Sequence, residues 1–398
     1  MSPLRRRDAA PDEESGKLDC KWSSAVVVEE SVFSELALEW LELYESCPAA
    51  TPFQSHAWLE SWWREYGKSG RLRVVLVRRS GRLVAAAPLY LRRRGAFVVL
   101  APLGGGISDY TDFLVRHDQG TETLKRLAVA LREQPKWHVL DIPEAREGGA
   151  ACQLFEVWPG HRKSVASSVC FELPGWPIED LVSTLPASTA GKTRSKLRKL
   201  AVAGILSHTV PPQSVPAGIA AMLNLHEEQW RERGINPEHL RPRFARHLSV
   251  AVRGMVELSQ AVLTEHWLEG ELVASDLALV GNNSVGGYLY GMRPHLRQRV
   301  DVTLMLLRDK LSLTYELGKP TFTFLRGQEP TKMRWRPIPV QNYRLLLAGS
   351  SSSSAAIYTS AVRSRAWCRG RTLRHPAAVA IAKRRFPWVP GIRRAQNS

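Results

Sequence analysis

The segment with the most reactive side chains lies near the carboxyl end of the chain, at residues 326–332. It carries one glutamate, Glu329, between two cationic residues, Arg326 and Lys332. A carboxylate can take a proton from a reacting group, and a lysine or arginine can bind an anion. We therefore predict that Glu329 is a catalytic base and that Arg326 and Lys332 bind substrate. An ion pair between Arg326 and Glu329 that only fixes the loop is the structural alternative.

A second set of polar side chains lies just before a helix predicted at residues 302–317. Backbone N–H groups at a helix N-terminus bind phosphate, and arginine side chains pair with it. We therefore predict that this segment binds the phosphate groups of a cofactor, through Arg293, Arg297, Gln298 and Arg299. Asp301 is placed like an N-cap residue, so a capped helix with solvated arginines is the alternative.

Two tyrosines and an aspartate lie on strands predicted before this helix. Tyr288 and Tyr290 are two residues apart on the strand at 284–292, so we expect them on one face as candidate catalytic acids. Tyrosines in strands more often belong to the core, with only the hydroxyl group in a polar setting. Asp276, on the strand at 271–280, is a candidate substrate-binding residue, and exposure to solvent is its alternative.

Paired acids follow three glycines in the first part of the chain. Gly104–Gly106 precede Asp109 and Asp112, but the Gly-Lys-Ser/Thr ending of a nucleotide-binding loop is missing. We predict that the two carboxylates bind a cationic or hydroxyl-rich substrate, and a structural turn is the alternative.

Hydrophobic periodicity predicts two halves with similar content, which indicates an α+β protein of two lobes. In the first half it predicts strands at 24–29, 71–78, 83–91, 96–102, 112–115 and 137–142, with helices at 33–46, 55–66 and 122–133. In the second half it predicts strands at 165–173, 205–210, 255–268, 271–280, 284–292 and 321–325, with helices at 216–232, 241–253 and 302–317.

Composition divides the chain further. We predict a disordered segment at 1–20, a first lobe at 21–160, a second lobe at 161–348 and a basic tail at 349–398. Residues 351–398 contain 10 Lys and Arg and no Asp or Glu, so this part supplies +10 of the net charge of +17. Such a tail can adsorb to an anionic membrane surface. We expect a chain that ends at residue 350 to keep the stability of the full chain.

Three segments resemble a known family, the CelD/BcsL-type branch of the GNAT acetyltransferase superfamily. They are Thr51-Pro-Phe-Gln-Ser-His-Ala-Trp-Leu-Glu-Ser-Trp-Trp-Arg-Glu-Tyr-Gly67, His226-Glu-Glu-Gln-Trp-Arg-Glu-Arg-Gly234 and Phe322-Thr-Phe-Leu-Arg-Gly-Gln-Glu-Pro-Thr-Lys-Met-Arg-Trp335. Their order and spacing are similar to the family's over about residues 24–346. The third segment departs from the family pattern F-D-F-L-R-G-D-E-P-Y-K-x-R-W at Thr323, Gln328 and Thr331.

The resemblance implies a mixed α/β fold of two tandem GNAT-like lobes, each with a central mixed sheet flanked by helices. It implies acetyl-CoA or another acyl-CoA as the donor, held by the second lobe. The implied activity is N- or O-acyl transfer to an envelope or polysaccharide precursor in the cleft between the lobes. In this scheme Glu329 deprotonates the acceptor, and Tyr288 or Tyr290 protonates the leaving thiolate.

Two other functions are consistent with the same residues. A FemAB-like aminoacyl transferase would use charged tRNA, bound by the basic tail and by the basic helix at 192–199; nucleic acid is expected only in that case. A degenerate GNAT fold that serves as a binding subunit would explain the departures from the family pattern.

The five cysteines are scattered and include no Cys-x-x-Cys pair, so we expect neither a disulfide framework nor a metal site. No apolar run reaches the ~18 residues that a membrane-spanning helix needs, and the first residues do not resemble a secretion signal. We therefore predict a cytoplasmic protein that can associate peripherally with the inner face of the membrane, and we make no prediction of its oligomeric state.

Overall fold

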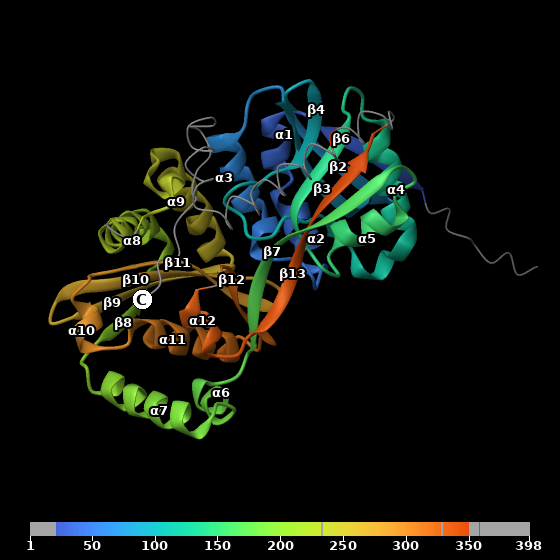
Figure 1. The fold of residues 1–398 in the computed structure, drawn as a ribbon. Coiled ribbons are helices and arrows are strands. Elements are labelled where there is room, and N and C mark those ends of the chain that lie inside the picture. Colours follow the sequence, from blue (N-terminus) through green and yellow to red (C-terminus); the bar gives the residue numbers. More distant parts are fainter. Residues whose placement is uncertain (1–20, 232–233, 328, 350–357, 359–398) are drawn as a thin grey trace, which may run out of the picture.

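The computed structural model describes residues 21–231, 234–327, 329–349 and 358. The predicted segment at 1–20 and most of the predicted tail at 349–398 lie outside the described residues. The described strands form one mixed sheet in the order β1-β2-β3-β4-β6-β13-β7-β12-β11-β10-β9-β8, and β5 pairs with β3 (Figure 1). The predicted mixed α/β fold is confirmed, and the strands of the two lobes join in a continuous sheet.

In the first lobe, helices cover both faces of the sheet. The strands are β1 (Trp22–Val27), β2 (Leu72–Arg79), β3 (Arg82–Arg94), β4 (Phe97–Pro102), β5 (Leu114–Val115) and β6 (Val139–Arg146). The helices are α1 (Glu30–Glu35), α2 (Ala37–Glu45), α3 (His56–Tyr66), α4 (Gly120–Glu133) and α5 (Ala150–Val157). Side chains of α2 and α3 pack in one hydrophobic cluster, and those of α4 and α5 pack in another on the opposite face.

The second lobe has the same layered plan. Its strands are β7 (Arg162–Pro174), β8 (Leu206–Thr209), β9 (Ala261–Leu268), β10 (Glu271–Val280), β11 (Ser284–Met292), β12 (Thr321–Arg326) and β13 (Ile338–Ala348). Its helices are α6 (Ile178–Ser183), α7 (Ala187–Ala201), α8 (Val215–Trp230), α9 (Pro242–Glu257), α10 (Leu296–Arg299), α11 (Val302–Glu316) and α12 (Pro330–Met333). Helices α8 and α9 lie on one side of the sheet and α11 lies on the other (Figure 1).

Two features join the lobes. Strand β13 lies between β6 of the first lobe and β7, and it is antiparallel to both. Helix α3 packs on α9, where Ser61 donates a hydrogen bond of 3.0 Å to the carbonyl oxygen of His247. The Trp58 and His247 rings meet edge to face, with their centroids 4.6 Å apart. The two lobes therefore share one hydrophobic core, which runs from α2 and α3 to α8 and α9.

Tyr358 lies in the core of the first lobe, although we expected the chain beyond residue 350 to lie outside it. Its side chain is buried and its ring packs edge to face on Phe97, with centroids 5.5 Å apart. Its hydroxyl donates a hydrogen bond of 2.6 Å to the buried carboxylate of Asp141, which also pairs with Arg344 at 2.6 Å. Residue 358 therefore belongs to the packing of the first lobe, because the outer face of β4 and β6 is apolar enough to bury it.

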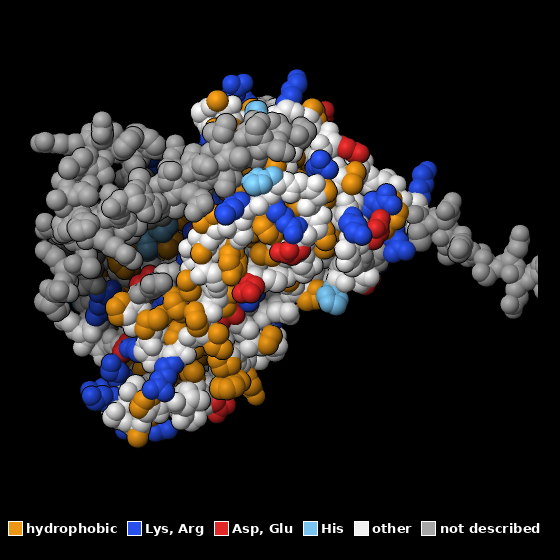
Figure 2. Space-filling model, turned by 45° about the vertical axis from the view of Figure 1, so that its right-hand side comes forward, with side chains coloured by type: hydrophobic (Ala, Val, Ile, Leu, Met, Phe, Trp, Pro, Cys, Tyr) orange, Lys and Arg blue, Asp and Glu red, His pale blue; other side chains and the backbone are white. Residues whose placement is uncertain are grey.

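Helix α7 carries the predicted basic segment. Ala190, Thr193 and Leu200 are its buried side chains, and most of its lysines and arginines are exposed. The lower end of the molecule, where α7 lies in Figure 1, shows Lys and Arg side chains in blue on the face seen in Figure 2. Among the described helices, none combines the length and apolar composition that crossing a membrane requires.

Candidate active site

The candidate site is formed where two neighbouring parallel strands separate. Strands β11 and β12 pair only from Ser284 to Gly286, opposite Thr321 to Thr323. In β11, Gly287 pairs with Ala278 and Leu289 pairs with Leu277, so Tyr288 is an extra, bulged residue. A bulge bends a strand and interrupts its pairing. The two strands therefore diverge after Gly286.

Strand β12 is also irregular at this point. Its register with β7 shifts between Thr323 and Arg326, and Leu325 has a φ of 58°, in the left-handed region that side chains rarely adopt. The Leu325 N–H donates to the Thr323 hydroxyl at 3.0 Å, which holds this turn. Thr323 is thus a local structural residue, in the position where the resembled family has Asp.

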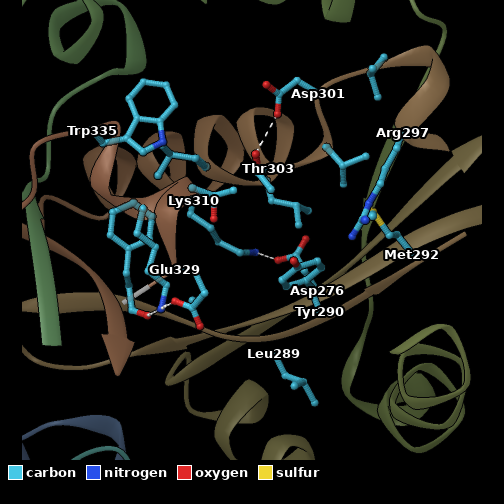
Figure 3. Close-up of a pocket in the computed structure, with 18 of the residues that line it drawn as sticks. Asp276, Leu289, Tyr290, Met292, Arg297, Asp301, Thr303, Lys310, Glu329 and Trp335 are labelled. Carbon is cyan, nitrogen blue, oxygen red and sulfur yellow. Dashed lines mark hydrogen bonds and ion pairs between the residues drawn. The ribbon is translucent and has the colours of Figure 1, made fainter. Parts of the chain in front are cut away.

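The gap between the strands is a cavity of about 860 Å³. Its lining residues come from β10, β11, β12, α11 and α12, and also from α7, α8 and α10. Figure 3 shows some of them as sticks. Apolar side chains line it, among them Leu277, Leu289, Met292, Leu306, Phe324 and Trp335. Cationic side chains also line it: Lys196, Lys199, Arg297, Arg299, Arg326 and Lys332. The cavity can hold an apolar group, and its cationic side chains favour an anionic one.

Glu329, the predicted base, lies in the lining with a side chain that is 54% exposed. Its carboxylate pairs with Lys332 at 2.8 Å, and the Lys332 ammonium also donates to the Phe324 and Arg326 carbonyl oxygens at 3.1 and 3.0 Å. The alternative pairing of Glu329 with Arg326 is wrong, because Arg326 turns to Asp109 instead, at 2.6 Å. Glu329 is thus accessible to a substrate that enters the cavity.

The two acids predicted to bind substrate in the first lobe have protein partners. The carboxylate of Asp109 is engaged by Arg326. Asp112 is buried and accepts hydrogen bonds from the backbone N–H groups of Phe113, Ala150 and Ala151, so it caps the start of α5. Burial raises its pKa to about 6. Neither residue lines the cavity, so substrate binding by Asp109 and Asp112 stays a prediction.

The two candidate tyrosines line the cavity but lie on opposite faces of β11. The bulge turns Tyr288 toward the core shared by the lobes, where its hydroxyl donates to the Ile107 carbonyl oxygen at 2.9 Å. Tyr290 packs against the cluster that contains Met292 and Leu306. The expectation of a common face is therefore wrong, because the extra residue reverses the alternation of side chains. Burial raises the pKa of Tyr288 well above its usual value.

The predicted phosphate-binding residues are only partly brought together. Arg297, Gln298 and Arg299 line the cavity, and Arg299 also pairs with Glu269 at 2.8 Å. Arg293 lies outside the lining and pairs with Glu228 at 2.6 Å. Three of the four predicted side chains can therefore meet a ligand in the cavity.

Asp301 occupies the N-terminus of α11, as the capped-helix alternative requires. Its carboxylate accepts a hydrogen bond of 3.1 Å from the Leu304 N–H and another of 2.8 Å from the Thr303 hydroxyl. It also pairs with Lys196 at 2.9 Å and Arg334 at 3.1 Å. Partial burial opposes ionisation, but these two cations hold the pKa of Asp301 well below its usual value. The carboxylate thus makes contacts that a phosphate group would make at a helix N-terminus.

Sequence reasoning missed the group at the centre of the cavity. Lys310 on α11 is buried and forms an ion pair with Asp276 on β10, and both side chains line the cavity (Figure 3). Asp276 is therefore buried, and its solvent-exposed alternative is wrong. No signal in the sequence identified Lys310, because a lysine in an amphipathic helix is normally solvated. Among the described residues, no cluster of three or more His, Cys, Asp or Glu side chains could hold a metal.

Comparison with known proteins agrees with this geometry. Residues 187–333 match the family described as acetyltransferase (GNAT) domain, and these residues include the cavity's strands and helices. The chain thus contains a GNAT-type transferase domain in its second lobe. Membership of the CelD/BcsL-type branch stays a prediction. A search of curated protein sequences found no match.

Two solved structures are similar to the chain over most of its length. One is FemX, with a TM-score of 0.59 and 11% identity, covering 81% of this chain and 96% of FemX. Another is L-PGS from Bacillus licheniformis, with a TM-score of 0.51 and 11% identity, covering 82% of this chain and 96% of L-PGS. At such low identity the likeness shows the fold, and it extends over both lobes.

Proposed function

We propose that the protein transfers an acyl group from acetyl-CoA or another acyl-CoA to an amine or hydroxyl acceptor, in the cavity between β11 and β12. The observation that carries this proposal is the separation of these two strands inside the GNAT-type domain. Beyond Gly286, the β11 edge that faces β12 has no strand partner among the described residues. The Tyr290 carbonyl oxygen of this strand is bonded to His226 Nδ1 at 2.7 Å. Other backbone groups of the edge can bind an extended ligand, as a sheet edge binds a peptide.

The pantetheine arm of CoA suits such an edge, because it is extended and contains two amide groups. The apolar lining, with Leu289, Met292 and Leu306, suits a short acyl chain. In direct transfer the acceptor attacks the thioester without a covalent enzyme intermediate, so positioning of the two reactants supplies much of the rate, up to ~7–11 kcal/mol in favourable cases.

An amine acceptor arrives as an ammonium ion and must lose a proton before it can attack. Glu329 is placed to take this proton, because its carboxylate is half exposed and lines the cavity. Lys332, which touches both Glu329 and the backbone of β12, fixes the loop that carries it. The Arg326 side chain is 32% exposed although it pairs with Asp109. The guanidinium nitrogens that do not contact Asp109 would bind the substrate.

The phosphates of the donor cannot use the N-terminus of α11 as it stands, because Asp301 fills it. We therefore assign the CoA phosphates to the cationic end of the cavity, at Lys199, Arg297 and Arg299. Replacing Arg297 and Arg299 by Ala should weaken CoA binding in isothermal titration by ~2–4 kcal/mol, since a charge-assisted bond contributes ~1.5–3 kcal/mol. Asp301→Ala, which removes a competing anion, should strengthen CoA binding severalfold.

The direct test is acyl transfer by the full chain. Acetyl-CoA and longer acyl-CoA esters are offered with a panel of amines and glycan precursors, while released thiol is followed and products are identified by mass spectrometry. The envelope or polysaccharide class of acceptor rests on the CelD/BcsL resemblance and is tested by the same panel. If no acyl-CoA binds in titration and no thiol is released, the proposal fails. Binding of CoA without any transfer would favour the degenerate binding subunit.

The second candidate is an aminoacyl transferase that uses charged tRNA. Two observations favour it: Asp301 takes the place of a diphosphate at α11, and the exposed cations of α7 lie beside the cavity. Binding of tRNA that weakens steeply with salt, together with a loss of that binding on replacing Arg194 and Arg198 by Glu, would support this donor. Tight acetyl-CoA binding with no tRNA binding would exclude it.

A further inference from the structure

Lys310 lies in an unusual position for a lysine. Its side chain is only 6% exposed, and its ammonium group points across the cavity to the carboxylate of Asp276 (Figure 3). Apart from Thr314, the other buried positions on this helix are apolar, among them Leu304, Leu307 and Leu311. Packing alone would thus be satisfied by an apolar residue, and a buried ion pair is costly to desolvate.

A chain of hydrogen bonds holds the partner of Lys310 in place. His266 on β9 donates from Nε2 to the second carboxylate oxygen of Asp276, at 2.8 Å. The Ser207 hydroxyl on β8 lies 2.9 Å from the other ring nitrogen, Nδ1, of His266. Since a carboxylate can only accept, the proton of His266 is on Nε2, and Nδ1 accepts from Ser207. The arrangement therefore spans β8, β9, β10 and α11.

Among the described residues, few further charged groups lie close to these hydrogen-bonded side chains. Asp309 lies 3.9 Å from His266 Nδ1 and pairs with Arg308 at 2.7 Å. Burial lowers the pKa of His266 to about 4, so the ring is neutral at neutral pH. Burial also lowers the pKa of Lys310 to about 7, while the ion pair with Asp276 acts in the opposite direction because it stabilises the ammonium. Lys310 can thus exchange a proton at neutral pH, whereas an exposed lysine is always charged there.

We propose that Lys310 is the group that takes the proton from the acceptor nitrogen during attack, with Asp276 and His266 as its positioning residues. This inference rests on the acyl transfer proposed above and adds a second proton acceptor to it. An ammonium acceptor loses two protons on its way to an amide. Glu329 at the mouth takes the first, and Lys310 in the cavity takes the second.

The step balances as follows. The neutral amine forms a bond to the thioester carbonyl carbon and becomes a cationic nitrogen. The Lys310 lone pair takes a proton from this nitrogen, and Asp276 stabilises the resulting ammonium by accepting its hydrogen bond. The carbon–sulfur bond then breaks, and Lys310 gives the same proton to the departing thiolate. The products are an amide and a free thiol, and Lys310 is neutral again.

The first test measures the proton on Lys310 itself, without any donor or acceptor. In the full chain with lysine labelled at the side-chain carbon and nitrogen, NMR follows each lysine between about pH 5 and pH 10, and Lys310→Met identifies the Lys310 signal. We expect this signal to titrate near neutral pH. A Lys310 ammonium that stays charged to above about pH 9 would overturn the proposal.

The second test uses acetyl-CoA with aminoacetonitrile at neutral pH, where this weakly basic small amine is uncharged. Lys310→Arg keeps a cation that cannot be deprotonated, so transfer should fall by ~10²-fold or more while CoA affinity is unchanged. Lys319→Met, in the loop that follows α11, is the matched control and should transfer normally. Full transfer by Lys310→Arg would overturn the proposal.

The pH profile separates catalysis from a structural role. In the wild type, kcat/KM should fall as the pH drops below about 7, because Lys310 becomes charged. Asp276→Asn, which no longer stabilises the ammonium, should move this fall to lower pH; an unmoved profile would contradict the assignment. The double variant Lys310→Met with Asp276→Asn removes both charges of the buried pair, so no unpaired buried charge remains to destabilise the fold. It serves as the folding control for the single variants. If acetyl-CoA does not bind, the proposed donor is refuted. The titration of Lys310 is measured without acetyl-CoA, so the two proposals can fail separately.

Discussion

Arg326 on β12 and Asp109 of the first lobe form an ion pair that joins the two lobes beside the cavity. The Arg326 Nε lies 2.6 Å from Asp109 Oδ1, and the Arg326 backbone N–H donates to Asp109 Oδ2 at 3.2 Å. Glu144, also from the first lobe, lies 3.6 Å from the same guanidinium. The arginine of the most specific sequence motif thus fixes the left-handed turn at Leu325 against the first lobe.

Loss of this pair should cost stability. Asp109→Asn removes the charge that compensates Arg326, so we expect a loss of about 1–3 kcal/mol in the free energy of unfolding, measured with urea. Glu257→Gln is the control, since Glu257 pairs with Arg253 and both side chains are at least half exposed, and exposed pairs contribute about 0–1 kcal/mol. Equal losses in the two variants would mean that the Arg326–Asp109 pair has no special role.

Asp301 should make the stability of the fold depend on pH. Its pKa is lowered in the folded state, so the carboxylate contributes stability above its unfolded pKa of about 4, and this contribution is lost as the pH falls further. Asp301→Asn keeps a good N-cap residue but loses the charge that Lys196 and Arg334 bind. At pH 7 this variant should be less stable by about 1–3 kcal/mol.

The difference between Asp301→Asn and the wild type should shrink as the pH falls below about 4, in thermal or urea unfolding. Glu122→Gln serves as the control, because its pair with Arg126 is half exposed on both sides. A difference that persists at low pH would show that the charge of Asp301 contributes nothing to stability.

Glu329→Gln should separate catalysis from stability. Because the Glu329 side chain is 54% exposed, we expect the variant to unfold like the wild type. If it takes the first proton from the acceptor, kcat should fall by ~10²–10⁴-fold, and the deficit should narrow at high pH, where the amine is already neutral. Glu316→Gln, on an exposed part of α11, is the control. Normal turnover in Glu329→Gln would remove this residue from the mechanism.

Tyr358 should stabilise the first lobe although it lies beyond residue 350. Tyr358→Phe loses the hydrogen bond to Asp141 and should cost about 1–2 kcal/mol, and Tyr358→Ala should cost more because it also loses the packing on Phe97. The control is Tyr315→Phe, at a tyrosine that is 60% exposed. A chain that ends at residue 350 should show at least the loss of Tyr358→Ala. Unchanged urea unfolding in these variants would place residue 358 outside the core.

The sequence predicted the strands and helix around the cavity well, because strong local signals bound them. The turn between β9 and β10 has Glu269 at φ 55° and Gly270 at φ 84°, and Gly318 ends α11 at φ 62°. A positive φ favours glycine, so glycine residues in the sequence mark where such turns and helix ends occur. Ser55, the first residue of the helix predicted at 55–66, caps α3 and accepts from the Trp58 N–H.

Other elements were missed where local signals are weak or contradictory. The predicted helix at 33–46 is interrupted at Leu36, and the strand predicted from 255 begins at Ala261 because α9 continues to Glu257. Strand β13 was not predicted, because Pro337 and Pro339 interrupt its pattern and proline disfavours strands. Its partners, β6 and β7, are distant in sequence, so no local signal marks the pairing.

The same distinction applies to the site. Glu329, Lys332, Arg297 and Arg299 could be found because they stand in a motif or beside a helix start. Lys310 could not, because only the packing of α11 on β10 buries it.

The position of β13 has a consequence for how the chain folds. This strand completes the sheet of the first lobe by pairing with β6, yet it is made almost 200 residues after β6 during synthesis. Until then β6 has β4 on one side and an open edge on the other. An open edge can pair with other chains and aggregate. Nascent chains that stop before residue 338 should therefore depend on chaperones, and the first lobe should become resistant to protease only when the second is complete.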